Sequence, residues 1–306
     1  MKFSLTNEFK DRLREEILNY NIDFIQKSFE GVSYVDITEL LYEFDSNDSK
    51  YILDNIDFDI SAKIISELDE DNRKNFLKIF SAEEVAKFLN VIDSDDGADI
   101  LSELNVEFRG DVISQIDDSE KSKNLKELLR YDEDVAGGLM AIELVKCNIN
   151  WKINQCIDLI KKQAENVSNI YSVYVTDNKG KLLGKVSLKD IILAKDNSRI
   201  KDVYDDYVIS VDAKMNQEEV SQIMQKYDLT VLPVVNKRGK LLGRITIDDV
   251  VDVITETAEE ERQIMSGITS DVEEDDSIWK LSNARLPWLV IGCLLYTSDA
   301  ADDSLR

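Results

Sequence analysis

The chain of 306 residues is long enough for two ordinary domains, and its 43% apolar residues can bury real cores. A formal net charge of −25, from 62 acidic and 37 basic residues, disfavours nucleic acid as a partner, because phosphate binding needs clustered Lys and Arg. The chain has no histidine, which excludes catalytic triads, histidine bases and histidine-ligated zinc. Its three cysteines are scattered, with no CxxC motif, so a thiolate metal site is not expected. Any bound metal would therefore have oxygen ligands, which hard cations such as Mg²⁺ prefer.

A twelve-residue repeat fills much of the first half of the chain: an apolar residue recurs, and a helix-capping side chain follows it each time. Such side chains accept hydrogen bonds from the free N–H groups at a helix N-terminus, so each unit predicts a cap and a short helix. Stacked short helices can bury a continuous apolar stripe, which predicts a helical superhelix over about residues 20–130. The predicted caps are Asp45, Asp57, Asp69, Ser81, Asp93, Asn105 and Asp117.

Beyond residue 131 the pattern changes to a two-fold repeat. The run Gly180-Lys-Leu-Leu-Gly184 recurs unchanged as Gly239-Lys-Leu-Leu-Gly243. Each copy follows a predicted helix and strand and precedes a strand and a helix, so the unit of helix, strand, turn, strand and helix occurs twice.

Residues 227–251 of the second unit resemble a cystathionine-β-synthase-type (CBS) motif. Residues 131–140, Tyr-Asp-Glu-Asp-Val-Ala-Gly-Gly-Leu-Met, resemble the junction between the helical domain and the CBS pair of MgtE-type magnesium channels. The likeness covers about residues 20–292. It implies an α+β fold with an N-terminal α-helical superhelix, a tandem CBS pair and a C-terminal amphipathic connecting helix. The implied function is the cytosolic Mg²⁺ sensor and gate of a magnesium channel, not an enzyme.

We expect a helical domain at 1–130, CBS domains at 131–199 and 200–262, a plug-like connecting helix and the start of a transmembrane segment at 263–296, and a tail at 297–306. The apolar run at its end has eleven residues, where a bilayer needs about twenty. We therefore expect a truncated or frameshifted product whose tail is foreign to the family. The alternative is an amphipathic helix that closes a soluble protein.

Mg²⁺ takes one or two protein carboxylates and keeps much of its water, so a sensor needs several acidic pairs at domain contacts. Asp95 and Asp99 lie four residues apart, on one face of a predicted helix, and by resemblance they face Gly138 and Asp249. Any one of these carboxylates alone is better explained as a solvated side chain, whereas the set placed by the resemblance favours metal binding. The resemblance implies as metal-binding residues Asp95, Asp99, Gly138, Glu218, the backbone of Gln225, Asp228, Asp249, Asp252, Glu260 and Glu261.

Ser187 and Asp190, with Thr246 and Asp249 in the second repeat, occupy positions that meet the phosphate and ribose of an adenine nucleotide in CBS motifs. Tyr171 could stack on the base. A Ser or Thr three residues before an Asp is also a helix N-cap pattern, so ATP binding stays open. The resemblance thus implies Mg²⁺ as the bound ion, with ATP as a second candidate ligand.

The resemblance also implies a homodimer through the CBS pair, a transmembrane domain as partner, and a place at the cytoplasmic face of the membrane in a full-length protein. We expect the apolar helices ending at Ile192 and Val251 to form the two-fold contact. Two alternatives stay open: a free-standing CBS protein that senses adenine nucleotides, and a structural solenoid adaptor. An enzyme is least expected, because the chain has no Walker A, G-x-S-x-G or reactive-cysteine motif.

Overall fold

The computed structural model describes residues 6–163, 172–195, 197–265 and 286, without the side chains of residues 71, 256, 259–261 and 263–265. Tyr171, the connecting helix and apolar run expected up to residue 296, and the tail at 297–306 therefore lie outside the described residues, apart from single positions. The chain divides into one unit of residues 1–216 and 231–245 and another of 217–230 and 246–306, and we describe each by itself.

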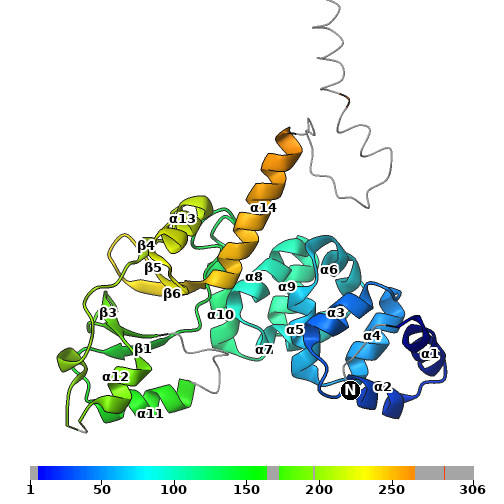
Figure 1. Ribbon diagram of the computed structural model, residues 1–306, viewed down its shortest axis with the longest axis horizontal. Helices are drawn as coiled ribbons and strands as arrows, with labels where there is room; N and C mark the ends of the chain where they lie inside the picture. The colour runs from blue at the N-terminus through cyan, green and yellow to red at the C-terminus, as the bar shows by residue number, and fades with distance from the viewer. Residues whose placement is uncertain (1–5, 164–171, 196, 266–285, 287–306) are drawn as a thin grey trace, which may run out of the picture. The chain divides into compact units, whose positions relative to one another are not determined.

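The first unit begins with short helices that follow one another along the chain, coloured blue to green in Figure 1. Helices two positions apart pack together: α3 on α5, α5 on α7, α7 on α9 and α8 on α10. This alternation is the packing of a helical superhelix and confirms the predicted fold. The helices are α1 (Asn7–Leu18), α2 (Ile22–Phe29), α3 (Tyr34–Leu41), α4 (Ser46–Asn55), α5 (Phe58–Glu67), α6 (Glu70–Leu77), α7 (Ala82–Val91), α8 (Ser94–Glu103), α9 (Val106–Ser114) and α10 (Ser119–Leu128).

The predicted caps occupy the N-cap positions of α4 to α9. The prediction of Asp117 was wrong by one residue: α10 is capped by Asp118, whose carboxylate accepts from the N–H groups of Glu120 and Lys121. Asp93 is also distinctive, because its side chain makes no cap hydrogen bond although it holds the N-cap position of α8.

The position four residues after the cap links successive turns of the superhelix. The Ser61 hydroxyl donates to the Leu53 carbonyl oxygen at 2.8 Å. Arg73 donates to the carbonyl oxygens of Ser66 and Leu68, and Arg109, thirty-six residues later, makes the same pair of bonds to Ser102 and Leu104. These bonds between neighbouring helices satisfy carbonyl groups at helix ends, which otherwise lack partners.

Each repeat of the second half contributes a three-stranded sheet, in the orders β1-β2-β3 and β4-β5-β6. In both sheets the first strand is parallel to the second. The predicted unit is confirmed as α11-β2-β3-α12 and α13-β5-β6-α14, and the leading strands β1 and β4 are additional. The elements are β1 (Val145–Asn148), α11 (Ile153–Gln163), β2 (Val173–Thr176), β3 (Leu182–Val186), α12 (Leu188–Leu193), the 3₁₀ helix η1 (Ile200–Asp202), β4 (Val211–Asp212), α13 (Gln217–Tyr227), β5 (Val231–Val235), β6 (Leu241–Thr246) and α14 (Ile247–Met265).

The two identical Gly-Lys-Leu-Leu-Gly runs contact each other. The Leu182 N–H donates to the Gly239 carbonyl oxygen at 2.9 Å, and the Leu241 N–H donates to the Gly180 carbonyl oxygen at 3.0 Å. Both glycines have a positive φ, +77° and +74°, a conformation that glycine adopts without steric cost. The repeat thus appears in three dimensions as a reciprocal pair of hydrogen bonds between its two copies.

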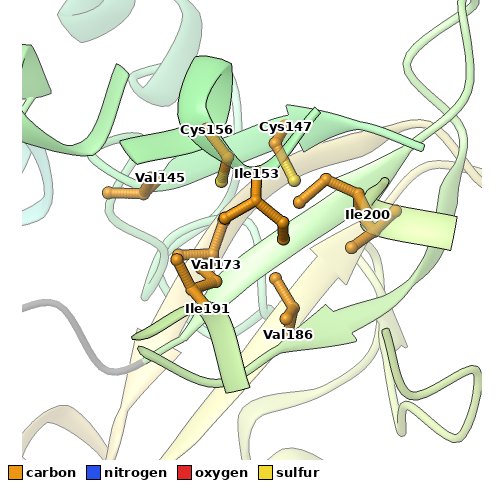
Figure 2. Packing of buried hydrophobic residues seen from close by; sticks show 9 residues of the cluster. Val145, Cys147, Ile153, Cys156, Val173, Val186, Ile191 and Ile200 are labelled. Atoms are coloured by element: carbon orange, nitrogen blue, oxygen red, sulfur yellow. The ribbon is translucent and has the colours of Figure 1, made fainter. Parts of the chain in front are cut away.

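The first sheet has its own apolar core, seen in Figure 2, to which strands and helices both contribute. The thiols of Cys147 and Cys156 lie inside this core, as free and buried cysteines. In the second unit α13 packs against α14. None of the described helices has both the length and the apolarity that crossing a bilayer requires.

Residues 135–144 connect the superhelix to the first CBS sheet, but they pair with the second repeat on the way. The N–H groups of Ala136 and Gly137 donate to the carbonyl oxygens of Met215 and Ala213. Further along, Ala141 and Arg244 exchange two backbone hydrogen bonds of 2.8 and 2.9 Å. The linker therefore forms isolated antiparallel bridges with β6 and with the segment that follows β4.

Candidate functional site

Helix α8 carries the predicted acidic pair Asp95 and Asp99. Burial, followed by the negative charge of Asp96, raises the pKa of Asp99 to about 7; Arg73 acts in the opposite direction, and Glu133 reinforces the rise. The Asp99 side chain is nevertheless exposed. Burial among the surrounding protein atoms is thus the largest cause of the raised pKa although the side chain keeps some contact with solvent, and the neighbouring carboxylates add to it.

Arg73 from α6 supplies positive charge beside this cluster but is already engaged. Its guanidinium pairs with Glu103 of α8, whose side chain is only 6% exposed, and it also donates to two backbone carbonyls. Glu103 forms the hydrogen bonds with the Arg73 guanidinium. Asp99 interacts with the Arg73 charge only electrostatically, without a hydrogen bond.

Gly138 belongs to a tight turn after α10. Its N–H donates to the Val135 carbonyl oxygen at 2.8 Å, and a Cβ at this position would lie 2.6 Å from the Asp132 carbonyl oxygen. At Gly137 a Cβ would lie 2.3 Å from the Tyr131 ring. Steric exclusion of any larger side chain therefore explains the two glycines, independently of a cation at the Gly138 carbonyl oxygen.

Glu218, Gln225 and Asp228 all belong to α13 or its end, and their side chains are exposed. Glu218 lies in the first turn, whereas Asp228 follows the last residue, which places them about 15 Å apart along the axis at 1.5 Å per residue. One Mg²⁺ cannot bind both, since its ligands lie at about 2.1 Å. Gln225 and Asp228 are close, because the Asp228 N–H approaches the Gln225 carbonyl oxygen at 3.4 Å.

Asp249 and Asp252 lie three residues apart on α14, on one face of the helix. Burial, and then the charge of Asp248, raises the pKa of Asp252. Asp249 accepts from the Thr246 N–H at 2.8 Å and from the Thr246 hydroxyl at 2.7 Å, a helix-capping arrangement. The side chains of Glu260 and Glu261 lie outside the described part of the chain.

The first repeat contains a related arrangement, in which a hydroxyl again donates to the carboxylate three residues later. The Ser187 hydroxyl accepts from the Asp190 N–H at 3.0 Å and donates to the Asp190 carboxylate at 2.6 Å. Of the nucleotide-contacting residues that the CBS resemblance suggests, Ser187 caps α12, and Thr246 and Asp249 hydrogen bond to each other at the start of α14. A nucleotide would have to bind around these caps or exchange their hydrogen bonds.

Within the described side chains, no three carboxylates or thiols converge closely enough to hold an ion by themselves. Mg²⁺ usually binds through one or two protein carboxylates and completes its shell with water. The acidic pairs on α8 and α14 are thus chemically suited to Mg²⁺, although none forms a dense cage.

Sequence reasoning missed a polar cluster at the junction of the superhelix and the linker. We call it the junction cluster: Asp93, Lys121, Glu143 and Arg244. No local pattern could have revealed it, because Asp93 and Arg244 lie 151 residues apart. In the sequence Asp93 looks like every other cap of the repeat, and only the structure shows that its side chain makes no cap hydrogen bond.

The fold and these acidic groups define a class: a helical superhelix joined to a pair of CBS-type units. Residues 32–134 match the family described as the MgtE intracellular N domain, and residues 134–197 and 200–256 match the CBS domain. Over these residues the chain has an MgtE intracellular N domain followed by a CBS pair.

Individual relatives agree. The chain is 36% identical over 184 residues to the magnesium transporter MgtE of Enterococcus faecalis, covering 60% of this chain and 40% of that protein. It is 36% identical over 176 residues to the MgtE of Thermus thermophilus, covering 57% and 39%. The crystal structure of the cytosolic domain of the Mg²⁺ channel MgtE in complex with ATP superposes with a TM-score of 0.74 at 29% identity, covering 80% of this chain and 99% of that one. The chain spans about two fifths of the length of the curated relatives it matches.

Proposed function

We propose that this chain is the Mg²⁺-sensing and gating region of a magnesium channel. The region closes when Mg²⁺ bridges acidic groups at the interfaces between its domains. In the full-length protein it would lie at the cytoplasmic face of the membrane and act on the transmembrane domain. The proposal extends the family assignment, since transport and gating belong to whole proteins of which this chain covers a part.

The observation that carries the proposal is the charge around α8. Burial is the largest cause that raises the pKa of Asp99 to about 7, and the negative charges of Asp96, Glu133 and Glu103 add to it. Two like charges 4 Å apart repel by about 4 kcal/mol at an effective dielectric of 20. A divalent cation relieves that repulsion, whereas its removal restores it, which is the requirement for a metal-controlled switch.

Asp228 supports a second cation position. It has a φ of +51°, in the left-handed region that glycine or asparagine usually occupies after a helix. Its carboxylate also follows the C-terminal end of α13, where the helix dipole disfavours negative charge. A bound cation would compensate both the carboxylate and the Gln225 carbonyl beside it.

The experiment that tests the proposal is a Mg²⁺ titration at constant ionic strength, followed by limited proteolysis of the full chain. Specific sites protect the chain at Mg²⁺ concentrations where NaCl of equal ionic strength has no effect. Identical protection by the two salts would leave only general screening of an acidic surface.

Adenine-nucleotide binding is the second candidate, favoured by the solved MgtE cytosolic domain that contains ATP. The Ser187–Asp190 and Thr246–Asp249 pairs present hydroxyls and carboxylates that could hydrogen bond to ribose and phosphate. Equilibrium dialysis with ATP tests it: Asp190→Asn should weaken binding, whereas the exposed control Asp59→Asn should not.

We also place a homodimer contact on the CBS pair. Ile192 and Leu193 of α12 are 78% and 70% exposed, and Val251 of α14 is 50% exposed, so both helices present apolar side chains at their surfaces. A two-fold axis would bury such helices against their copies.

A further inference from the structure

The core of the first CBS sheet contains two cysteines in contact with each other. Cys147 lies on β1 and Cys156 on α11, and they are 1% and 0% exposed. Their thiols are hydrogen-bonded to each other, and Figure 2 shows both sulfur atoms pointing into the same apolar core. Neither thiol belongs to the acidic pairs or to the nucleotide positions described above, so the proposed function leaves both without a role.

The side chains around this thiol pair are aliphatic, and they include Val145, Ile153 and Val173. A single buried cysteine in such surroundings is ordinarily an inert packing residue, because nothing stabilises its thiolate. Here each thiol has the other as its polar neighbour. Two neighbouring thiols can be oxidised together to a disulfide, which a single thiol cannot do alone.

The hydrogen bond makes the two thiols unequal. The bond with Cys156, and then burial, raises the pKa of Cys147, whereas the same bond lowers the pKa of Cys156 against the effect of burial. Cys156 is therefore the thiol that ionises first and acts as the nucleophile, since the thiolate is the reactive form. Cys147 keeps its proton and lies beside the Cys156 sulfur, in position to react second.

The fold also suits a short covalent link between the two side chains. Helix α11 packs on β1, and the two cysteines are nine positions apart in the sequence. A disulfide requires Cβ atoms about 3.5–4.5 Å apart. Thiols that already hydrogen bond can reach this geometry by rotation of the side chains, without rearrangement of β1 or α11.

We propose that Cys147 and Cys156 are a modification site, at which a small disulfide oxidant such as oxidised glutathione forms an internal disulfide between β1 and α11. The Cys156 thiolate attacks one sulfur of the oxidant, so a mixed disulfide forms and one small thiolate leaves. The Cys147 thiol then loses its proton and attacks the Cys156 sulfur, and the second small thiolate leaves. Two protein thiols and one small disulfide thus become one protein disulfide and two small thiols.

Burial sets the condition for this reaction. The oxidant reaches the thiols only when α11 opens from β1, so the reaction follows a local opening of the first CBS sheet. Once formed, the disulfide opposes the same opening. The amide hydrogens of α11 should therefore exchange about tenfold more slowly in the oxidised chain, whereas those inside α5 should keep their rates.

Mass spectrometry of the oxidised full chain tests the site directly. The chain is incubated with excess oxidised glutathione, its remaining thiols are alkylated, and it is digested with trypsin without reduction. Trypsin cleaves after Lys146, Lys152 and Lys161, so a disulfide between the two cysteines joins residues 147–152 to residues 153–161. This linked pair of peptides should be the main product, and it should disappear after treatment with a dithiol.

Two variants separate the steps, and each keeps a small apolar side chain in the core. Cys147→Ala removes the second thiol, so oxidation should stop at the mixed disulfide of Cys156 with glutathione. Cys156→Ala removes the nucleophile and should slow the modification of Cys147 about tenfold or more. Cys293, which lies outside the described residues, is replaced by serine in every chain, so that it cannot compete.

The wild-type result decides the proposal even if either alanine variant folds poorly. The proposal is overturned if the folded chain forms no linked peptides under conditions in which the urea-unfolded chain forms them. Glutathione attached to both cysteines of the folded chain, or a link between two chains on a non-reducing gel, overturns it equally.

This proposal does not rest on Mg²⁺ sensing, and a Mg²⁺ titration of the reduced chain separates the two. Linked peptides without any Mg²⁺-specific protection would leave the disulfide site and remove the sensor. Mg²⁺-specific protection in a chain that forms no linked peptides would remove the disulfide site and leave the sensor.

Discussion

The Asp93 carboxylate lies 3.3 Å from the Arg244 guanidinium, although Asp93 holds the N-cap position of α8. Every other described N-cap side chain of the repeat, from Asp45 to Asp118, bonds to the start of its own helix. One unit of the repeat is thus diverted from local capping to contact with β6. The Asp93 side chain thus contacts β6 of the CBS pair, where the equivalent side chains of the other repeat units cap their own helices.

The close approach of β6 to the linker predicts a strong effect of a methyl group at Gly243. A Cβ there would lie 2.5 Å from the Ala141 carbonyl oxygen, so Gly243→Ala should destabilise the chain by more than about 2 kcal/mol. Gly110, inside α9, has open space around it, and Gly110→Ala should stabilise by about 0.5–1 kcal/mol. Urea unfolding of both variants checks this, and equal effects would contradict the packing of the linker.

Glu143 predicts a loss of stability in acid. Burial alone would raise its pKa, but Lys121 and Ser94 outweigh burial and hold the pKa of Glu143 below its ordinary value. A carboxyl with a lowered folded pKa stabilises the fold above its unfolded pKa of about 4.3, and the contribution disappears as the pH falls through the folded pKa.

Glu143→Gln should therefore cost about 2 kcal/mol at pH 7 and progressively less below about pH 4.3. Urea unfolding between pH 7 and pH 3 measures the difference. The exposed variant Glu107→Gln is the control and should show no such trend. A cost of Glu143→Gln that is the same at every pH would mean that the ion pair with Lys121 does not contribute.

Asp99 predicts the opposite dependence and a link to the metal. Its folded pKa is raised to about 7, so its contribution to stability is present below its unfolded pKa of about 3.9 and lost as the pH rises through about 7. Mg²⁺ needs the deprotonated carboxylate. If Asp99 is a ligand, the Mg²⁺ midpoint for protease protection should be about tenfold higher at pH 6 than at pH 8.

Asp99→Asn should abolish that pH dependence, whereas the exposed control Asp111→Asn should keep it. The same pH dependence in Asp99→Asn would assign the titration to another group.

The exposed apolar surface of α12 predicts that Ile192→Asp breaks the dimer. A charge at the centre of an apolar two-fold contact meets its own copy, so the dissociation constant should rise at least about tenfold. Sedimentation measures it, since the monomer has a mass of 35.0 kDa. Leu18 of α1 is 77% exposed, and Leu18→Asp is the matched control. A wild-type chain that sediments as a monomer at micromolar concentration would contradict the proposed dimer contact.

Much of the fold could be predicted because it is written in local patterns. Asp57 and Ser81 cap their helices through local hydrogen bonds, so their residue types predict the helix starts. The duplicated Gly-Lys-Leu-Leu-Gly run indicates two equivalent units. The α+β organisation followed from these two repeats. The leading strands β1 and β4, of four and two residues, were missed.

The candidate site was harder to predict, because its chemistry depends on contacts distant in sequence. The pairing of Ala141 with Arg244 and the capping of α8 by Glu143 have no counterpart in any local motif. The separation of Glu218 from Asp228 by the length of α13 likewise became clear only with the helix bounds. The roles of the acidic residues as Mg²⁺ ligands stay predictions.

The measurement that tests the central claim most directly compares Mg²⁺ with NaCl on a variant lacking two predicted ligands. Asp228→Asn with Asp249→Asn removes two charges while preserving shape, and Asp59→Asn with Asp111→Asn removes two from exposed helix positions. A sensor predicts that only the first pair raises the Mg²⁺ midpoint for protease protection, by at least about tenfold, while compaction in NaCl is unchanged. Small, parallel shifts of both responses in both variants would contradict it and leave an acidic surface without a Mg²⁺ site.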